Sequence, residues 1–136
     1  MIREIMHDPL FLQRKSLRAT AADRAIAEDL VDTLRANLDR CVGMAANMIG
    51  QRKRIIAFCN GPLIIVMLNP RIISKSGEYE TEEGCLSLEG VRKTKRYRTI
   101  TVTWQDTEMV SRTGTLTGFA AQIVQHEIDH CDGILI

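Results

Sequence analysis

The chain has 136 residues, of which 45% are hydrophobic and 26% are charged, and its formal net charge at pH 7 is +1. This composition is typical of a globular protein, and we expect residues 1–136 to form a single domain. A nearly neutral chain creates no field that would attract phosphates, so direct nucleic-acid binding is not expected. No apolar run approaches the roughly 18–20 residues of a membrane-spanning helix, and no secretory signal begins the chain. We therefore expect no membrane association, a cytoplasmic location, and reduced thiols at the four cysteines.

The N-terminal part of the chain predicts one scaffold helix. Residues 1–18 are expected to be irregular, because Pro9 interrupts any early helix. From about Ala22 to Arg40, apolar residues recur at helical spacing along one side, with charged residues opposite. Thr20 is the candidate N-cap, and Asp23 stands three residues later as in a capping box. Such a helix packs its single apolar face on a sheet.

Short strands are predicted through the middle of the chain. Apolar runs at 54–58 and 63–68, and a pair at 72–73, are separated by turn signals at Asn60-Gly61-Pro62 and Asn69-Pro70. Threonines alternate with apolar residues over 99–104, which is the pattern of a half-buried antiparallel strand. A further strand is predicted around 111–116.

A last helix is predicted from about Phe119 to Asp132, with Thr117 as its cap and Gly133 as its stop. Its apolar residues lie on two sides, and only a narrow strip is plainly polar: Gln122, Gln125, Asp129 and Asp132. A helix that is apolar on two sides is usually buried between layers. The order of elements therefore predicts an α+β fold, with short antiparallel strands packed around this C-terminal helix.

The last helix carries the sequence H-E-x-x-H at His126, Glu127 and His130. Histidines at positions i and i+4 project to the same side of a helix, at a separation that suits one metal ion. The Glu between them can exchange a proton with water activated at that ion. This pattern alone would also fit a general metalloprotease. His7 has no such spacing around it, and we expect it to be an ordinary surface residue.

A catalytic metal site usually takes three protein ligands and leaves one position open. Only six residues follow His130, so the third ligand must lie upstream. Cys85 is the best candidate, because Gly84 before it permits a close backbone approach and a thiolate is a strong donor. Spacing alone leaves Cys41 and Cys59 as alternatives, whereas Cys131 lies on the opposite side of the helix and is expected to pack in the core.

Two intact motifs resemble the peptide deformylase family: Glu83-Gly84-Cys85-Leu86-Ser87 and Gln125-His126-Glu127-Ile128-Asp129-His130. The resemblance implies that the chain removes the formyl group from the N-terminal formyl-methionine of newly made polypeptides. It also favours Cys85 over the other cysteines as the ligand that joins His126 and His130. The implied cofactor is one divalent ion, Fe²⁺ in the cell, with Zn²⁺ and Ni²⁺ as alternatives. The implied partners are N-formylmethionyl nascent peptides, with the ribosome as the place of encounter.

The resemblance also implies roles around the metal. Glu127 would be the general base and acid, and the backbone N–H of Leu86 would help to hold the developing oxyanion. Gly43 would lie beside the substrate backbone, while Val42, Ile123 and the helix face near His126 would border the methionine pocket. Ser87 and Asp129 are expected to orient the ligands rather than to take part in the chemistry.

A third family motif, G-x-G-x-A-A-x-Q, is altered here to Cys41-Val42-Gly43-Met44-Ala45-Ala46-Asn47-Met48. Met48 replaces a Gln that donates a hydrogen bond to the oxyanion, and a thioether has no donor. Losing one such donor typically lowers the rate about 10²–10³-fold. The alternative hypothesis is therefore a deformylase-like metal-binding protein with weak or altered activity. The basic run 91–98 is expected to be a solvated loop and strand edge.

Overall fold

The computed structural model describes all 136 residues and contains one five-stranded sheet flanked by helices. Every neighbouring pair of strands is antiparallel, and the order in the sheet is the order in the chain, β1-β2-β3-β4-β5. The strands are β1 (Gly43–Ala45), β2 (Ile55–Asn60), β3 (Leu63–Cys85), β4 (Leu88–Gln105) and β5 (Ser111–Thr117). The helical elements are α1 (Pro9–Leu12), η1 (Ala21–Asp23), α2 (Arg24–Ala36), η2 (Ala46–Ile49) and α3 (Gly118–Cys131).

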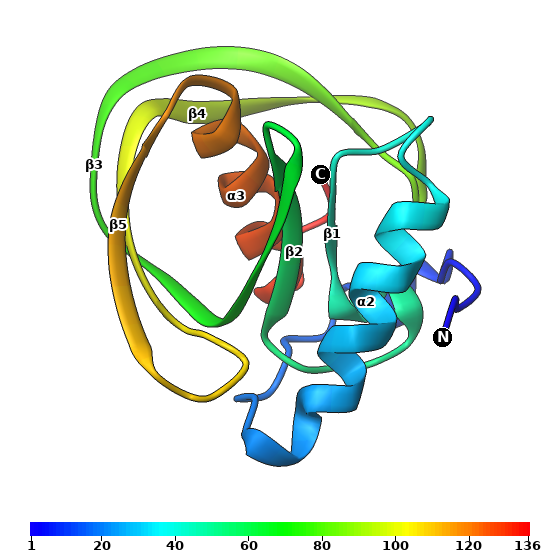
Figure 1. Ribbon diagram of the computed structural model, residues 1–136. Helices are drawn as coiled ribbons and strands as arrows, with labels where there is room; N and C mark the ends of the chain where they lie inside the picture. Colours follow the sequence, from blue (N-terminus) through cyan, green and yellow to red (C-terminus); the bar gives the residue numbers. More distant parts are fainter.

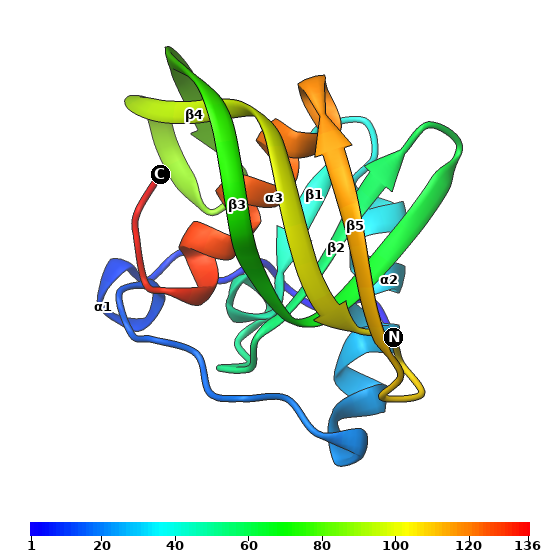
Figure 2. The ribbon, with the colours of Figure 1, turned by 90° about the vertical axis from the view of Figure 1, so that its left-hand side faces the viewer.

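The sheet separates the two long helices. Helix α2 packs on β1 and β2, whereas α3 contacts β1, β2, β4 and β5 from the other side. Strands β3, β4 and β5 curve around α3, so that this helix lies inside the bend of the sheet (Figures 1 and 2). This arrangement confirms the predicted α+β class, the N-terminal scaffold helix and the central C-terminal helix.

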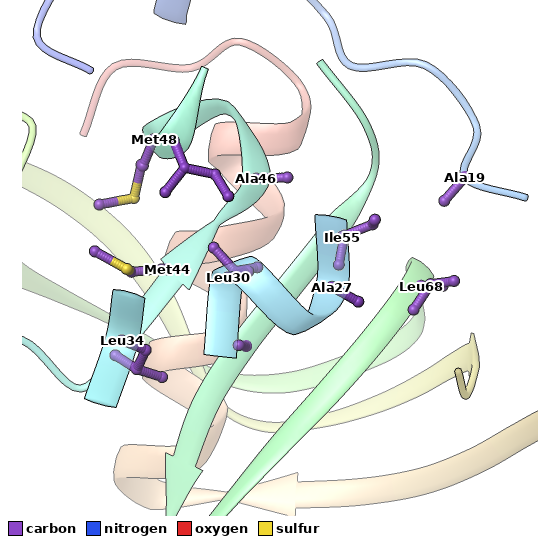
Figure 3. Packing of buried hydrophobic residues seen from close by; sticks show 11 residues of the cluster. Ala19, Ala27, Leu30, Leu34, Met44, Ala46, Met48, Ile55 and Leu68 are labelled. Atoms are coloured by element: carbon purple, nitrogen blue, oxygen red, sulfur yellow. The ribbon is translucent and has the colours of Figure 1, made fainter. Parts of the chain in front are cut away.

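Alternation along β2 builds two hydrophobic cores, one on each face. Ile55 and Ala57 belong to the cluster under α2, while Ile56 and Phe58 belong to the cluster around α3. The α2 cluster is shown in Figure 3. Burying one such aliphatic side chain contributes about 1.5–3 kcal/mol, so both faces of the sheet are firmly attached to their helices.

The N-terminal boundaries differ in part from the predicted ones. The capping box before α2 is confirmed, because Thr20 accepts from the N–H of Ala22 and Asp23 accepts from the N–H of Thr20. The expectation that Pro9 prevents a helix was wrong. Pro9 begins the short helix α1, with Asp8 accepting from the N–H of Leu10 at 3.0 Å. Proline is tolerated at a first helical position because its missing N–H has no partner there.

The strands β3 and β4 are much longer than predicted, with 23 and 18 residues. Asn69-Pro70 is not a turn between strands but an irregularity within β3, where the pairing register shifts between Leu68 and Arg71. Asn69 has a positive φ of 53°, and its side chain bonds both the N–H and the carbonyl of Ala19. These bonds hold the bulge, and the strand continues beyond it.

Beyond this bulge, β3 and β4 continue as a ribbon with opposite charges facing each other. Glu80 pairs with Lys95, and Glu82 pairs with Lys93. Such cross-strand pairs each contribute roughly 0.2–1 kcal/mol. The ribbon ends at Cys85, which places the EGCLS segment beside α3.

Candidate metal centre

The structure brings Cys85, His126 and His130 together, although 40 residues lie between the first two in the chain. The Sγ atom of Cys85 lies 3.2 Å from Nε2 of His130, which in turn lies 3.1 Å from Nε2 of His126. All three potential ligand atoms lie within 4.8 Å of one another. Tetrahedral metal bonds of about 2.0–2.3 Å would separate such atoms by about 3.3–3.7 Å. The observed cluster therefore has the size of a three-ligand metal site.

The chemistry of the donors also fits a transition-metal ion. One thiolate and two imidazoles suit Zn²⁺ or Fe²⁺ rather than Mg²⁺ or Ca²⁺, which prefer oxygen. Cys41 and Cys59 lie outside this cluster. Burial, reinforced by the charge of Glu127, raises the pKa of the Cys41 thiol to about 11, so it stays neutral near pH 7. Cys131 is fully buried in the core around α3, as expected of a packing residue.

The ring of His126 is held by Glu83, a residue for which the sequence motif indicated no role of its own. Nδ1 of His126 lies 2.9 Å from Oε1 of the buried Glu83, which leaves Nε2 to face Cys85 and His130. A carboxylate on the distal nitrogen fixes the orientation and tautomer of a metal-binding imidazole. Glu83 is thus a positioning residue for the site.

Glu83 is itself held by a buried arginine. Arg96 donates to both oxygens of Glu83 at 2.7–3.2 Å and to Oδ2 of Asp129 at 2.7 Å. Only 4% of Arg96 is exposed, so the expectation that the whole basic run 91–98 is solvated was wrong for this residue. A buried guanidinium must be paired, and the two carboxylates supply that pairing. Asp129 acts through Arg96, in keeping with its expected orienting role.

The charge state of this network follows from its contacts. Burial alone would raise the pKa of Glu83, but hydrogen bonds from His126, Arg96 and Gln122 outweigh burial and lower it to about 2. The two imidazoles cannot both be protonated, because their Nε2 atoms are only 3.1 Å apart. Burial and the neighbouring charge of His126 lower the pKa of His130, so it is ready to ligate as a neutral ring.

Glu127 lies between the ligands and the cavity. It is 4% exposed, and its Oε1 atom is buried without a hydrogen-bond partner. Burial raises its pKa to about 7, which matches a group that must take and return a proton near neutral pH. Gly43 packs directly against it: a Cβ atom at this position would come within 2.9 Å of Oε2 of Glu127 and 2.6 Å of Ile123. Only glycine therefore fits at position 43.

A cavity of about 570 Å³ opens beside these residues. Apart from Met48, eight residues were predicted for the site, and seven of them line this cavity. Met48 also lines it, whereas His130 is fully buried and does not. The predicted residues in the walls are Val42, Gly43, Cys85, Leu86, Ile123, His126 and Glu127. Arg40, Glu82, Phe119 and Gln122 also line it, although no sequence pattern marked them as site residues.

Leu86 and Met48, the two residues that the resemblance places near the oxyanion, both line the cavity. The backbone N–H of Leu86 donates no hydrogen bond within the protein, so it is free to donate one to an oxygen atom of a ligand. Met48 is 1% exposed, and its sulfur accepts from the N–H of Ala45 at 3.5 Å. The amide of Asn47 donates to the carbonyl of His130 at 2.9 Å, so it does not replace the donor that Met48 lacks.

Two further residues near Cys85 differ from expectation. The hydroxyl of Ser87 is buried without a partner, so no contact to a ligand supports an orienting role. His7 is exposed, as predicted, but its Nδ1 lies 3.0 Å from the carbonyl oxygen of Ser87. The N-terminal segment therefore contacts the EGCLS turn.

None of the helices combines the length and apolar character that a membrane crossing requires.

The fold and the site together define a metal-dependent hydrolase: three side chains that could hold a metal ion, a buried carboxyl group next to them in α3, and a cavity lined by members of both. The family model for polypeptide deformylases matches residues 2–136. The chain belongs to the peptide deformylase family, whose known function is the deformylation of nascent peptides.

Individual relatives agree with this assignment. A peptide deformylase of Clostridium beijerinckii is 56% identical over 136 residues, covering 100% of both chains. The crystal structure of the peptide deformylase of Thermotoga maritima is 28% identical, covers 99% of this chain and 95% of its own, and has a TM-score of 0.89. A class I type b peptide deformylase of Acinetobacter baumannii, crystallised with Met-Ala-Ser bound, is 26% identical, covers 99% and 97% of the two chains, and also has a TM-score of 0.89.

Proposed function

We propose that residues 1–136 act as one domain that removes the N-formyl group from formyl-methionyl peptides, with Cys85, His126 and His130 holding the metal ion. The observation that carries this proposal is the convergence of these three ligand atoms beside the buried Glu127. Family membership and the intact EGCLS and QHEIDH segments support it. We favour Fe²⁺ as the ion in the cell, with Zn²⁺ and Ni²⁺ able to occupy the same donors.

A divalent ion at this site would supply Lewis-acid activation of a water molecule and of the formyl oxygen. Glu127 then accepts the proton of the attacking water and returns it to the leaving amine, for which its raised pKa is suited. The free N–H of Leu86 donates to the formyl oxygen as negative charge develops on it. Gly43 lets the substrate backbone lie close to Glu127, and Val42 and Ile123 border the pocket for the methionine side chain.

The substrates of this reaction are new polypeptides that still carry formyl-methionine. We therefore propose a cytoplasmic location and an encounter with nascent chains at the ribosome. The Met-Ala-Ser bound to the Acinetobacter baumannii protein supports a site for a peptide that begins with methionine.

The direct test is release of formate from formyl-Met-Ala-Ser by the Fe²⁺-loaded protein. Glu127→Ala serves as the control, because it keeps the three ligands and removes the proton-transferring group. Formate release well above this control supports the proposal. Equal release by both proteins would contradict it, and cleavage at internal peptide bonds would point to a general protease instead.

A further inference from the structure

The wall of the cavity contains a polar side chain that the proposed mechanism does not use. Gln122 lies one helical turn before His126 on α3 and lines the same cavity as Val42, Ile123 and Phe119. It is partly buried, and its Nε2 atom lies 2.9 Å from Oε2 of Glu83. Its neighbours Val42, Ile123 and Phe119 in the wall are apolar, so an amide among them needs an explanation.

The contact with Glu83 determines which atom of the Gln122 amide, nitrogen or oxygen, faces Glu83. Glu83 is an ionised carboxylate that already receives Arg96 and His126, and a carboxylate can only accept hydrogen bonds. The Nε2 atom of Gln122 must therefore face Glu83, and one of its two N–H groups is used there. Gln122 makes no other side-chain hydrogen bond in the protein, so the second N–H is left for a ligand in the cavity.

We infer that Gln122 is a specificity residue that donates its second N–H to the thioether sulfur of the substrate's first side chain. This inference rests on the function proposed above, which places a methionine side chain in this part of the cavity. Sulfur in a thioether is a weak acceptor, and of Gln122, Val42, Ile123 and Phe119 only Gln122 carries a side-chain N–H. Val42, Ile123 and Phe119 supply apolar contact, which recognises size but not sulfur.

Norleucine separates these two kinds of recognition. It has the length and shape of methionine, but a methylene group replaces the sulfur. Burial in an apolar pocket would not favour methionine over norleucine, because the methylene is the more apolar group. A preference for methionine therefore requires a polar partner for the sulfur, and the amide of Gln122 is placed to be that partner.

The experiment compares kcat/KM for formyl-Met-Ala-Ser and formyl-norleucyl-Ala-Ser in the wild type, Gln122→Leu and Gln122→Met, each loaded with the same metal. We expect the wild type to prefer the methionine substrate roughly threefold to tenfold, the range of one modest hydrogen bond. In both variants this preference should fall to about onefold or below. Gln51→Leu, the same change at an exposed glutamine outside the cavity, should leave the preference unchanged.

The outcomes separate this inference from the proposed function. A wild type that cleaves neither substrate would contradict the proposed function, and the inference would fall with it. Activity on both substrates without a preference in the wild type would overturn the inference alone. Equal losses on both substrates in the variants would also overturn it, because Gln122 would then act only by holding Glu83. If the leucine variant does not fold, the isosteric methionine variant decides the result.

Discussion

The two long helices of this protein, α2 and α3, pack on the same sheet but differ in what they bury. Helix α2 buries one stripe, with Ala27, Leu30 and Leu34 against the sheet and charged residues on the other side. Helix α3 buries nine of its fourteen residues, and four of those nine are polar or titratable. These four are Gln125, His126, Glu127 and His130.

The difference shows how a fold can carry a reactive site inside its core. Buried polar groups destabilise a protein unless they are paired, and most of those on α3 have partners. Gln125 bonds the backbone of Tyr97 on β4, and His126 is held by Glu83 at the end of β3. The Oε1 atom of Glu127 and the Nδ1 atom of His130 have none. The unsatisfied group on Glu127 faces the site where chemistry is expected, whereas α2 has only to hold the sheet.

The largest effect is expected from removing the thiolate. Cys85→Ala should leave only the two histidines, so the purified protein should lose its metal and its formate release should fall to the level without protein. Cys85 is partly exposed and packs against the α2 cluster without being one of its buried members, so the far-ultraviolet circular dichroism should not change. Metal analysis of wild type and variant after identical purification measures this. A variant that retains one equivalent of metal would show that Cys85 is not a ligand.

Matched substitutions on the two sides of the sheet should separate stability from metal binding. Arg96→Leu leaves the buried Glu83 and the partly buried Asp129 without their cation, and should lower the free energy of unfolding by about 3–5 kcal/mol. It should also weaken metal binding about 10–100-fold, since Glu83 orients His126. Leu30→Ala under α2 should cost about 2–5 kcal/mol and leave metal affinity unchanged. Denaturant titration measures the stability of each variant, and metal competition measures its metal affinity. Equal losses of metal affinity in the two variants would contradict the proposed difference between the two sides of the sheet.

The acid stability of the metal-free protein should depend on Glu83. Its pKa is lowered from 4.5 to about 2 in the folded protein, so its ionised form stabilises the fold above pH 4.5. This contribution, of roughly 3 kcal/mol by the size of the shift, is lost as the pH falls from about 4.5 to about 2. The difference in unfolding free energy between the wild type and Glu83→Gln should shrink over that window. A difference that is constant between pH 6 and pH 2.5 would contradict the assigned pKa.

The smallest effect is expected at Met48. If the missing amide limited the reaction, Met48→Gln would raise kcat/KM about 10²–10³-fold. We expect a change of less than tenfold, because the N–H of Leu86 remains available and the comparisons favour an active deformylase over the diverged alternative. Formate release by both proteins under the same metal loading measures it. A gain of a hundredfold or more would revive the hypothesis of a weakened enzyme.

The sequence was informative where a residue pattern maps directly onto geometry. Helical spacing located α2 and α3, the capping box located the start of η1, and H-E-x-x-H identified two of the three clustered ligand atoms. The third ligand atom, the sulfur of Cys85, was selected only with the help of the family resemblance. Cys85 is far from α3 in the sequence, and the curvature of the sheet around α3 brings the two together.

Contacts between distant strands were harder to predict. The ribbon of β3 and β4 is rich in charge, so its residues resembled loops, although acidic residues of β3 face basic residues of β4. Arg96 lay within a basic run that gave no sign of its burial against Glu83. The polar strip of α3 gave no sign of its contacts: Gln122, Gln125 and Asp129 face the cavity or β4, and only Asp132 is exposed. Contacts with residues that are distant in the sequence determine the burial of these side chains, and a local sequence pattern does not reveal such contacts.

X-ray absorption spectroscopy of the metal-loaded protein tests the proposed centre most directly, because it counts sulfur and nitrogen atoms around the ion without relying on activity. With Zn²⁺ bound, we predict one sulfur at about 2.3 Å and two imidazole nitrogens at about 2.0–2.1 Å, and loss of the sulfur in Cys85→Ser. A first shell without sulfur, or with two or more sulfur atoms, would contradict the assignment of Cys85, His126 and His130 as the ligands.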